Sequence, residues 1–192
     1  RQLEETIRAI PSGKVIIADG KRGDIGNTAR AYAKAVFDRL GCDALTVNPY
    51  LGSDSLLPFI EDDMHGIYVL TVTTNPGGRE MQDLLVNGKP LYHIVAGMAH
   101  RINEQGNVGL VIGATRGELW PELVTAAAGM PLLVPGIGAQ GGDLTALKSA
   151  LIDYPAPVLV NASRSIIYAS SGNDFMSAAE RAASKLFREL VN

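Results

Sequence analysis

Cysteine is almost absent from this sequence. Cys42 is the only cysteine among 192 residues, so the chain has no internal disulfide and a reducing compartment is expected. Long hydrophobic runs are also missing, since no apolar stretch approaches the roughly 20 residues that a bilayer-spanning helix needs. The chain does not open with a signal-peptide pattern. We therefore predict a cytoplasmic protein that does not associate with a membrane.

Positive charge is not in excess either. Lys and Arg number 17 against 20 Asp and Glu, for a formal net charge of −3. A general nucleic-acid-binding domain normally carries a basic surplus, so nucleic acid is not expected as a partner. A local basic site for a small anion stays possible. With 46% apolar and 19% charged residues, the composition is that of an ordinary globular protein with one substantial core.

Short β-branched apolar runs alternate with longer helical patterns along the chain. The runs are almost continuously apolar, which is typical of strands buried on both faces of a parallel sheet. We predict strands at 14–18, 44–48, 67–73, 108–112, 131–134 and 157–161. We predict helices at 1–10, 27–40, 53–61, 90–105, 116–128, 142–152 and 174–190. The looser stretch 74–90 is a candidate active-site loop.

Strict alternation of strand and helix indicates an α/β fold, either an open doubly wound sheet or a (β/α)8 TIM barrel. A complete barrel has eight strands in about 250 residues. Here six strands occupy 192 residues, and the sequence opens at Arg1 inside a helical pattern. We therefore predict a single barrel domain over 1–192 that is incomplete at its N-terminus, with the first two strands preceding Arg1. The open sheet is the alternative.

The stretch VIIADGKRGDIGNTARAYA places charged residues at the end of the first predicted strand. Side chains alternate along a strand, so Asp19 and Lys21 emerge on the same side, and Asp24 follows in the turn. The lysine could be a general acid, the two aspartates could bind a divalent metal, or the three could form a surface ion-pair network. Spacing alone does not choose among these roles. The histidines show no metal-ligand spacing: His65, His93 and His100.

Two glycine- and arginine-containing loops follow the last two predicted strands. PGIGAQGG contains Gly136, Gly138 and Gly141 in a G-x-G-x-x-G pattern, which is the dinucleotide fingerprint. That fingerprint requires an acidic residue about 20 positions later, but the next strand ends in Asn161 and then Arg164. Barrels often bind phosphate at the loops after strands seven and eight. A monophosphate site is therefore the better interpretation.

A third polar stretch, TVTTNPGG, ends the strand at 67–73. Thr73, Thr74 and Asn75 supply neutral donors and acceptors that suit an uncharged heterocycle or a sugar. A simple turn at the Pro-Gly pair explains the same residues, so this signal is weak alone. Lys14 and Arg116 could assist an anion site, although no pattern singles them out.

Taken together, these motifs resemble one enzyme family. DGKRGDIGNTARAYA, TTNPGG, GLVIGAT, VPGIGAQGG and VNASRSIIYAS occur in the order and spacing of the orotidine 5'-phosphate decarboxylases, and the chain resembles their longer bacterial subgroup. The resemblance covers nearly the whole chain. It implies a (β/α)8 barrel that converts orotidine 5'-phosphate to UMP and CO2 in pyrimidine synthesis without a cofactor or metal. It also implies a homodimer with active sites at the interface.

The resemblance further implies roles for the charged cluster. Asp19 would lie beside the substrate carboxylate, and Lys21 would protonate C6 of the pyrimidine. Asp24 would reach into the partner's site, with Ile25 and Thr28 beside it. The catalytic array of the family is Lys-Asp-Lys-Asp, whose first lysine lies on the second barrel strand. We expect that lysine, and an upstream aspartate for the ribose, before Arg1 in the parent enzyme.

Substrate-binding residues are implied on the other loops. Thr74 would bond the amide edge of the pyrimidine, while Gln140 and Arg164 would hold the phosphate. Backbone N–H groups near Gly141 and Ser163 would help them. Two alternatives stay open: a Mg-dependent sugar-phosphate decarboxylase or aldolase with a related D-x-K-x-x-D motif, and a fragment that binds nucleotide monophosphates without turnover.

Overall fold

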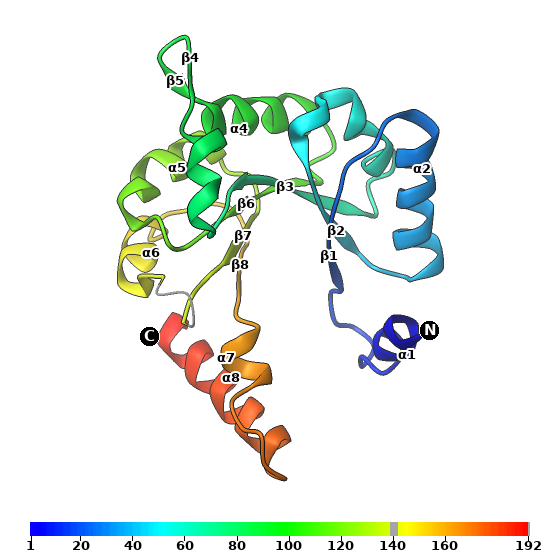
Figure 1. The fold of residues 1–192 in the computed structure, drawn as a ribbon, viewed down its shortest axis with the longest axis vertical. Helices are drawn as coiled ribbons and strands as arrows, with labels where there is room; N and C mark the ends of the chain where they lie inside the picture. Colours follow the sequence, from blue (N-terminus) through cyan, green and yellow to red (C-terminus); the bar gives the residue numbers. More distant parts are fainter. Residues whose placement is uncertain (139–141, 192) are drawn as a thin grey trace.

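Six parallel strands form one curved sheet in the computed structural model, which describes residues 1–138 and 142–191 (Figure 1). Their order in the sheet is the same as their order in the chain. The strands are β1 (Ile17–Arg22), β2 (Ala44–Val47), β3 (Gly66–Val72), β6 (Val108–Ile112), β7 (Leu132–Pro135) and β8 (Val158–Asn161). A small antiparallel hairpin, β4 (Leu85–Val86) and β5 (Lys89–Pro90), follows β3.

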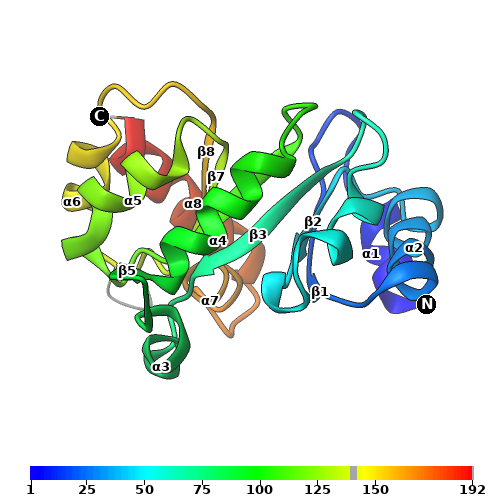
Figure 2. The same ribbon diagram turned by 90° about the horizontal axis from the view of Figure 1, so that it is seen from above.

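Helices connect the strands, and the larger ones form an arc around one side of the sheet (Figures 1 and 2). They are α1 (Gln2–Arg8), α2 (Gly26–Lys34), α3 (Arg79–Gln82), α4 (Leu91–Ile102), α5 (Trp120–Ala127), α6 (Leu144–Ala150), α7 (Arg164–Ile167) and α8 (Phe175–Val191). A π-helical turn, Ala35–Arg39, extends α2. Within the described ranges, no helix combines the length and the apolar character that crossing a membrane requires.

The strands β2, β6 and β7 bury almost every residue, which explains their continuous apolar runs. Leu110 and Leu132 are fully buried in the same core cluster as Ala99 of α4. The next residues along these strands, Val111 and Leu133, point to the opposite face because side chains alternate, and they line a cavity there. One face of the sheet therefore forms the core with the helices, and the other forms the floor of a cavity.

The order of the strands decides between the two predicted architectures. A doubly wound sheet reverses its strand order at a switch point, whereas β1-β2-β3-β6-β7-β8 runs in one direction without reversal. Among the described residues, β1 and β8 each pair with one strand only. The chain is therefore an incomplete (β/α) barrel with six of its strands, and the predicted fold class is confirmed.

The predicted position of the first strand was wrong by several residues. The prediction was 14–18, but β1 spans Ile17–Arg22 and pairs with β2 as far as Arg22 opposite Val47. The end of this strand contains polar residues because their side chains face a cavity rather than the core. The apolar pattern therefore did not reveal the strand. Asp19 and Lys21 therefore belong to the strand itself.

The predicted helix at 53–61 was also wrong. Three 3-10 turns occupy this region: Pro49–Leu51, Ser53–Ser55 and Leu57–Phe59. Pro58 has no N–H to continue a helix, and Ser55 Oγ donates to the Gly52 carbonyl at 2.6 Å, closing a local turn. The other predicted helices are confirmed with shifted ends, and the loop at 74–90 contains α3 and the β4–β5 hairpin.

Candidate active site

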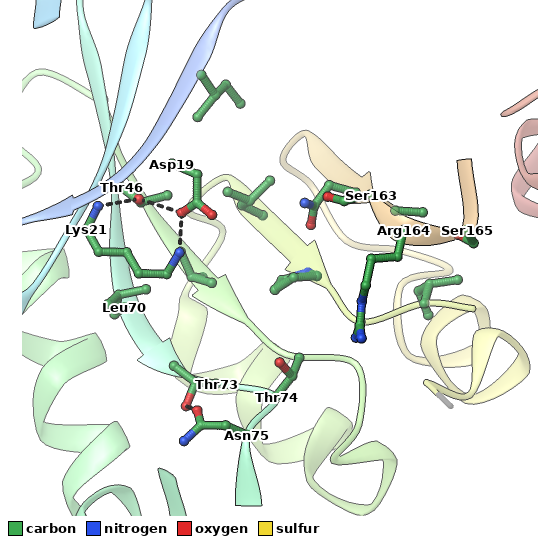
Figure 3. Close-up of a pocket in the computed structure, with 18 residues that line it drawn as sticks. Asp19, Lys21, Thr46, Leu70, Thr73, Thr74, Asn75, Ser163, Arg164 and Ser165 are labelled. Carbon is green, nitrogen blue, oxygen red and sulfur yellow. Dashed lines mark hydrogen bonds and ion pairs between the residues drawn. The ribbon is translucent and has the colours of Figure 1, made fainter. Parts of the chain in front are cut away.

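A cavity of about 660 Å³ opens at the C-terminal ends of the parallel strands (Figure 3). In barrel enzymes this end of the strands carries the active site. Apolar residues of β3, β6 and β7 form its floor, and polar residues from four separate chain segments surround it. These polar residues are Asp19, Lys21, Thr46, Thr73, Thr74, Asn75, Asn161, Ser163, Arg164 and Ser165.

An aspartate, a lysine and a threonine form the tightest polar cluster in the cavity (Figure 3). Lys21 Nζ donates to Asp19 Oδ1 at 2.6 Å, and Thr46 Oγ1 donates to the same oxygen at 2.9 Å. Thr46 Oγ1 in turn accepts from the Lys21 backbone N–H at 3.0 Å. The sequence predicted the Asp19–Lys21 pairing, but it held no signal for Thr46, which lies in an apolar strand.

The backbone at Lys21 is unusual. Its φ is +45°, a left-handed conformation that is uncommon outside glycine, and the pairing of β1 with β2 shifts register between Ala18 and Arg22. Such conformations persist where surrounding contacts hold them, and they concentrate at functional sites. Here the left-handed conformation and the register shift occur where the Lys21 side chain turns back to contact Asp19.

The electrostatics of the cluster keep Asp19 ionised. Burial raises the pKa of Asp19, but hydrogen bonds from Lys21 and Thr46, together with the lysine charge, outweigh this and hold the pKa below its usual 3.8. A carboxylate and an ammonium therefore lie side by side at neutral pH, and both side chains are more than half exposed to the cavity opening. This arrangement can stabilise negative charge on a bound molecule and can deliver a proton to it.

The turn after β3 presents neutral groups to the same cavity. Thr73 Oγ1 donates to Asn75 Oδ1 at 2.7 Å, and the side-chain amide of Gln82 contacts Thr73 twice. Thr115 Oγ1 donates to the Thr74 carbonyl at 3.4 Å. The sequence indicated the turn. Thr115 ends the GLVIGAT motif, to which no role was assigned, and Gln82 belongs to no recognisable motif.

The loops after β7 and β8 lie beside each other, as predicted. A Cβ atom added at Gly138 would be 3.4 Å from Ser165 Oγ, so glycine brings the two loops into contact. Ser163 and Arg164 line the cavity across from Lys21 (Figure 3). Gln140 and Gly141, which were predicted to bind phosphate, lie outside the described residues.

Three other predicted residues do not line this cavity. Asp24 Oδ1 accepts from the backbone N–H of Ile25 at 2.8 Å. The Ile25 side chain is 61% exposed, and Thr28 is exposed in the first turn of α2. Asp19 and Asp24 therefore do not converge on one point of the cavity, as a shared metal ion would require.

Two further observations bear on cations and anions. The positive group beside Asp19 is the ammonium of Lys21. In the described part of the chain, no three His, Cys, Asp or Glu side chains are grouped to hold a metal. Arg116, considered for an anion site, instead pairs with Asp83 at 2.5 Å away from the cavity lining.

Comparison with known proteins identifies related sequences over the whole chain. A model of the orotidine 5'-phosphate decarboxylase / HUMPS family matches residues 2–180. Orotidine 5'-phosphate decarboxylase of Roseiflexus sp. strain RS-1 is 50% identical over 194 residues, covering 99% of this chain and 70% of that protein. The protein of the same name from Dehalococcoides mccartyi strain 195 is 47% identical over 195 residues, covering 99% and 72%.

Solved structures agree with the sequence comparison. The structure of Leishmania donovani OMP decarboxylase superposes with a TM-score of 0.86 at 38% identity, covering 99% of this chain and 74% of that one. Almost all of this chain therefore corresponds to about three quarters of that chain.

Proposed function

The chain belongs to the orotidine 5'-phosphate decarboxylase / HUMPS family, and on that premise we propose that the protein decarboxylates orotidine 5'-phosphate to UMP in pyrimidine biosynthesis. The observation that carries the proposal is the Lys21 ammonium, held 2.6 Å from Asp19 at the opening of the cavity with Arg164 across from it. Cys42, the single cysteine, is buried and free, which fits a reducing compartment, and we place the protein in the cytoplasm.

Lys21 supplies the chemistry in this proposal. When the bond between C6 and the carboxylate breaks, CO2 leaves and the electron pair stays on C6. A fixed ammonium stabilises this developing negative charge and then transfers a proton from Nζ to C6. The lysine regains its proton from solvent. Each step uses a side chain of the protein, so the reaction needs no metal or organic cofactor.

Asp19 and Thr46 keep Lys21 ready for this step. The carboxylate accepts a hydrogen bond from the lysine and, with Thr46, fixes the ammonium in the cavity. The negative charge of Asp19 also lies where the substrate carboxylate would bind, so it disfavours the bound substrate relative to the state after CO2 loss. This effect is specific to the reacting end of the molecule.

Binding of the rest of the substrate is assigned to the other loops. Arg164 suits the 5'-phosphate because its guanidinium can donate two parallel hydrogen bonds to phosphate oxygens. Ser163, Gln140 and Gly141 complete the phosphate site in this proposal. Thr74 supplies hydrogen bonds for the amide edge of the pyrimidine. Phosphate binding far from C6 then positions the ring against Lys21.

A direct assay tests this function. We expect the purified protein to release CO2 from orotidine 5'-phosphate and to form UMP at a rate that excess EDTA leaves unchanged, because Lys21 rather than a metal stabilises the charge. Loss of activity with EDTA would support the Mg-dependent sugar-phosphate alternative. UMP binding without CO2 release would support a nucleotide-binding role instead.

We further propose that the protein is a homodimer whose partner completes each site. Asp24, Ile25 and Thr28 do not line the cavity of their own chain, and Ile25 is 61% exposed. Apolar residues near this region are also exposed, among them Tyr50 at 77% and Leu51 at 48%. A second copy that covers them would bring its Asp24 to the neighbouring cavity.

Mixing two inactive variants tests this shared site. Lys21→Ala and Asp24→Asn are each expected to lose most activity, but dimers of one copy of each contain one site with both native residues. Random exchange of subunits should therefore restore about a quarter of the wild-type rate. The control mixes Lys21→Ala with the double variant, which forms no intact site. Absence of recovery in the first mixture would contradict a shared site.

A further inference from the structure

A partly buried ion pair connects two loops behind the candidate active site. Arg116 follows β6 and is only 7% exposed, and its Nη1 donates to Asp83 Oδ1 at 2.5 Å. Arg116 Nε lies 3.5 Å from Glu118 Oε1. Asp83 directly follows α3, in the segment between β3 and α4. The pair therefore attaches this segment to the loop after β6.

The residue before Asp83 holds the turn that faces the cavity. Gln82 Oε1 accepts from the Thr73 backbone N–H at 3.1 Å, and Gln82 Nε2 donates to Thr73 Oγ1 at 2.8 Å. The contact leaves no room at Gly78, where an added Cβ would lie 2.6 Å from Thr73 Oγ1. A displacement of Asp83 would be transmitted through Gln82 to Thr73.

The residue before Arg116 holds the same turn from the other side. Thr115 Oγ1 donates to the Thr74 carbonyl at 3.4 Å. At Gly113, an added Cβ would lie 3.0 Å from the backbone nitrogen of Thr74, so the two backbones are in close contact. Two consecutive pairs of residues, 82–83 and 115–116, thus enclose the Thr73–Asn75 turn, and the Asp83–Arg116 ion pair joins them.

We propose that Asp83 and Arg116 are positioning residues that set the orientation of Thr74 and Asn75 in the cavity. Neither side chain lines the cavity, so both act through the turn. The role in substrate recognition rests on the proposed function: the turn faces the pyrimidine, whereas Arg164 faces the phosphate. Disruption of the ion pair should therefore weaken recognition of the base and leave recognition of the phosphate intact.

The burial of Arg116 allows a rescue experiment. Neutralising Asp83 leaves the buried Arg116 guanidinium with only the more distant Glu118 carboxylate, and neutralising Arg116 removes the ion-pair partner of the half-buried Asp83. Removing both charges leaves two neutral groups that can still form a hydrogen bond. Asp83→Asn and Arg116→Gln should each be harmful, and the double variant should recover. Arg79→Gln is the matched control, because Arg79 pairs with Glu118 in the same region but is 60% exposed.

Calorimetry with two probes measures the effect. We expect each single variant to bind UMP about 10- to 100-fold more weakly and to bind ribose 5-phosphate with unchanged affinity. The double variant should recover at least half of the lost UMP affinity on a logarithmic scale, and Arg79→Gln should bind UMP as tightly as the wild type. In a Thr74→Ala background, Arg116→Gln should add little further loss. Equal weakening of both probes, or additive losses, would overturn the proposal.

Amide hydrogen exchange in the absence of ligand tests the coupling between the ion pair and the turn independently of the proposed function. Residues 73–75 should exchange faster in the single variants than in the wild type, and the double variant should restore their protection. If orotidine 5'-phosphate is not turned over but exchange responds in this way, the proposed function fails and the coupling stands. Unchanged exchange at 73–75 in both single variants would refute the coupling itself.

Discussion

Replacing Lys21 with alanine is expected to lower kcat for orotidine 5'-phosphate by at least about 10⁴-fold. Proton donation by a positioned side chain contributes roughly 10²- to 10⁴-fold, and removing one electrostatic donor typically costs about 10²- to 10³-fold. Lys21 performs both tasks in the proposed mechanism. The loss should appear in kcat because the charge that Lys21 stabilises develops only as CO2 leaves. Release of CO2 in single-turnover experiments measures it.

Two measurements distinguish the loss of the proton donor from a general loss of structure in the variant. UMP affinity of Lys21→Ala should stay within about tenfold of the wild type, since the loops after β7 and β8 still hold the phosphate. Lys21→Arg keeps a positive charge beside Asp19, but its guanidinium does not readily give up a proton. It should therefore remain strongly impaired. Near-normal turnover in Lys21→Ala would rule out the proposed proton donor.

Replacing Arg164 with alanine should chiefly weaken substrate binding. Hydrogen bonds to charged groups contribute about 1.5–3 kcal/mol each, so loss of a bidentate phosphate contact corresponds to roughly 10²- to 10⁴-fold in kcat/KM. The effect should lie mainly in KM, because the phosphate keeps its charge throughout the reaction and is bound equally before and after CO2 loss. Initial-rate kinetics over a range of substrate concentrations separate the two parameters.

The nucleoside provides the control for Arg164. Uridine lacks the phosphate, so its weak binding should be the same in Arg164→Ala and in the wild type, whereas UMP binding should fall by the full factor. Arg164→Lys should recover part of the affinity, because lysine keeps the charge without the planar pair of donors. An unchanged KM with a reduced kcat in Arg164→Ala would contradict the phosphate role.

Several parts of the site could be predicted because neighbours in sequence carry them. Asp19 and Lys21 are two residues apart on a strand, and a period of two places both on one side. The glycine loop and Arg164 follow consecutive strands of a parallel sheet, so they meet at one edge. Local spacing is sufficient for such relations.

Other parts could not be predicted because their partners are far apart in sequence. Thr46 lies 25 residues beyond Lys21, and Arg116 lies 33 residues beyond Asp83. None of these pairs forms a motif, and Arg116 was considered for an anion site rather than a buried ion pair. The prediction of a helix at 53–61 failed for a related reason. Its apolar residues lie on a series of 3-10 turns, and their spacing in the sequence resembles that of a helix.

The sequence by itself determined the class of fold and the family. Continuous apolar runs that alternate with helical patterns indicate buried parallel strands, and the family motifs can be recognised from their order along the chain. It also determined which residue types carry the chemistry. Only the tertiary structure decided that β1 extends to Arg22, that Thr46 fixes the Asp19–Lys21 pair, and that Asp83 and Arg116 enclose the Thr73–Asn75 turn. The physical reason is that these features depend on contacts between strands and loops that the chain brings together only when the sheet has formed.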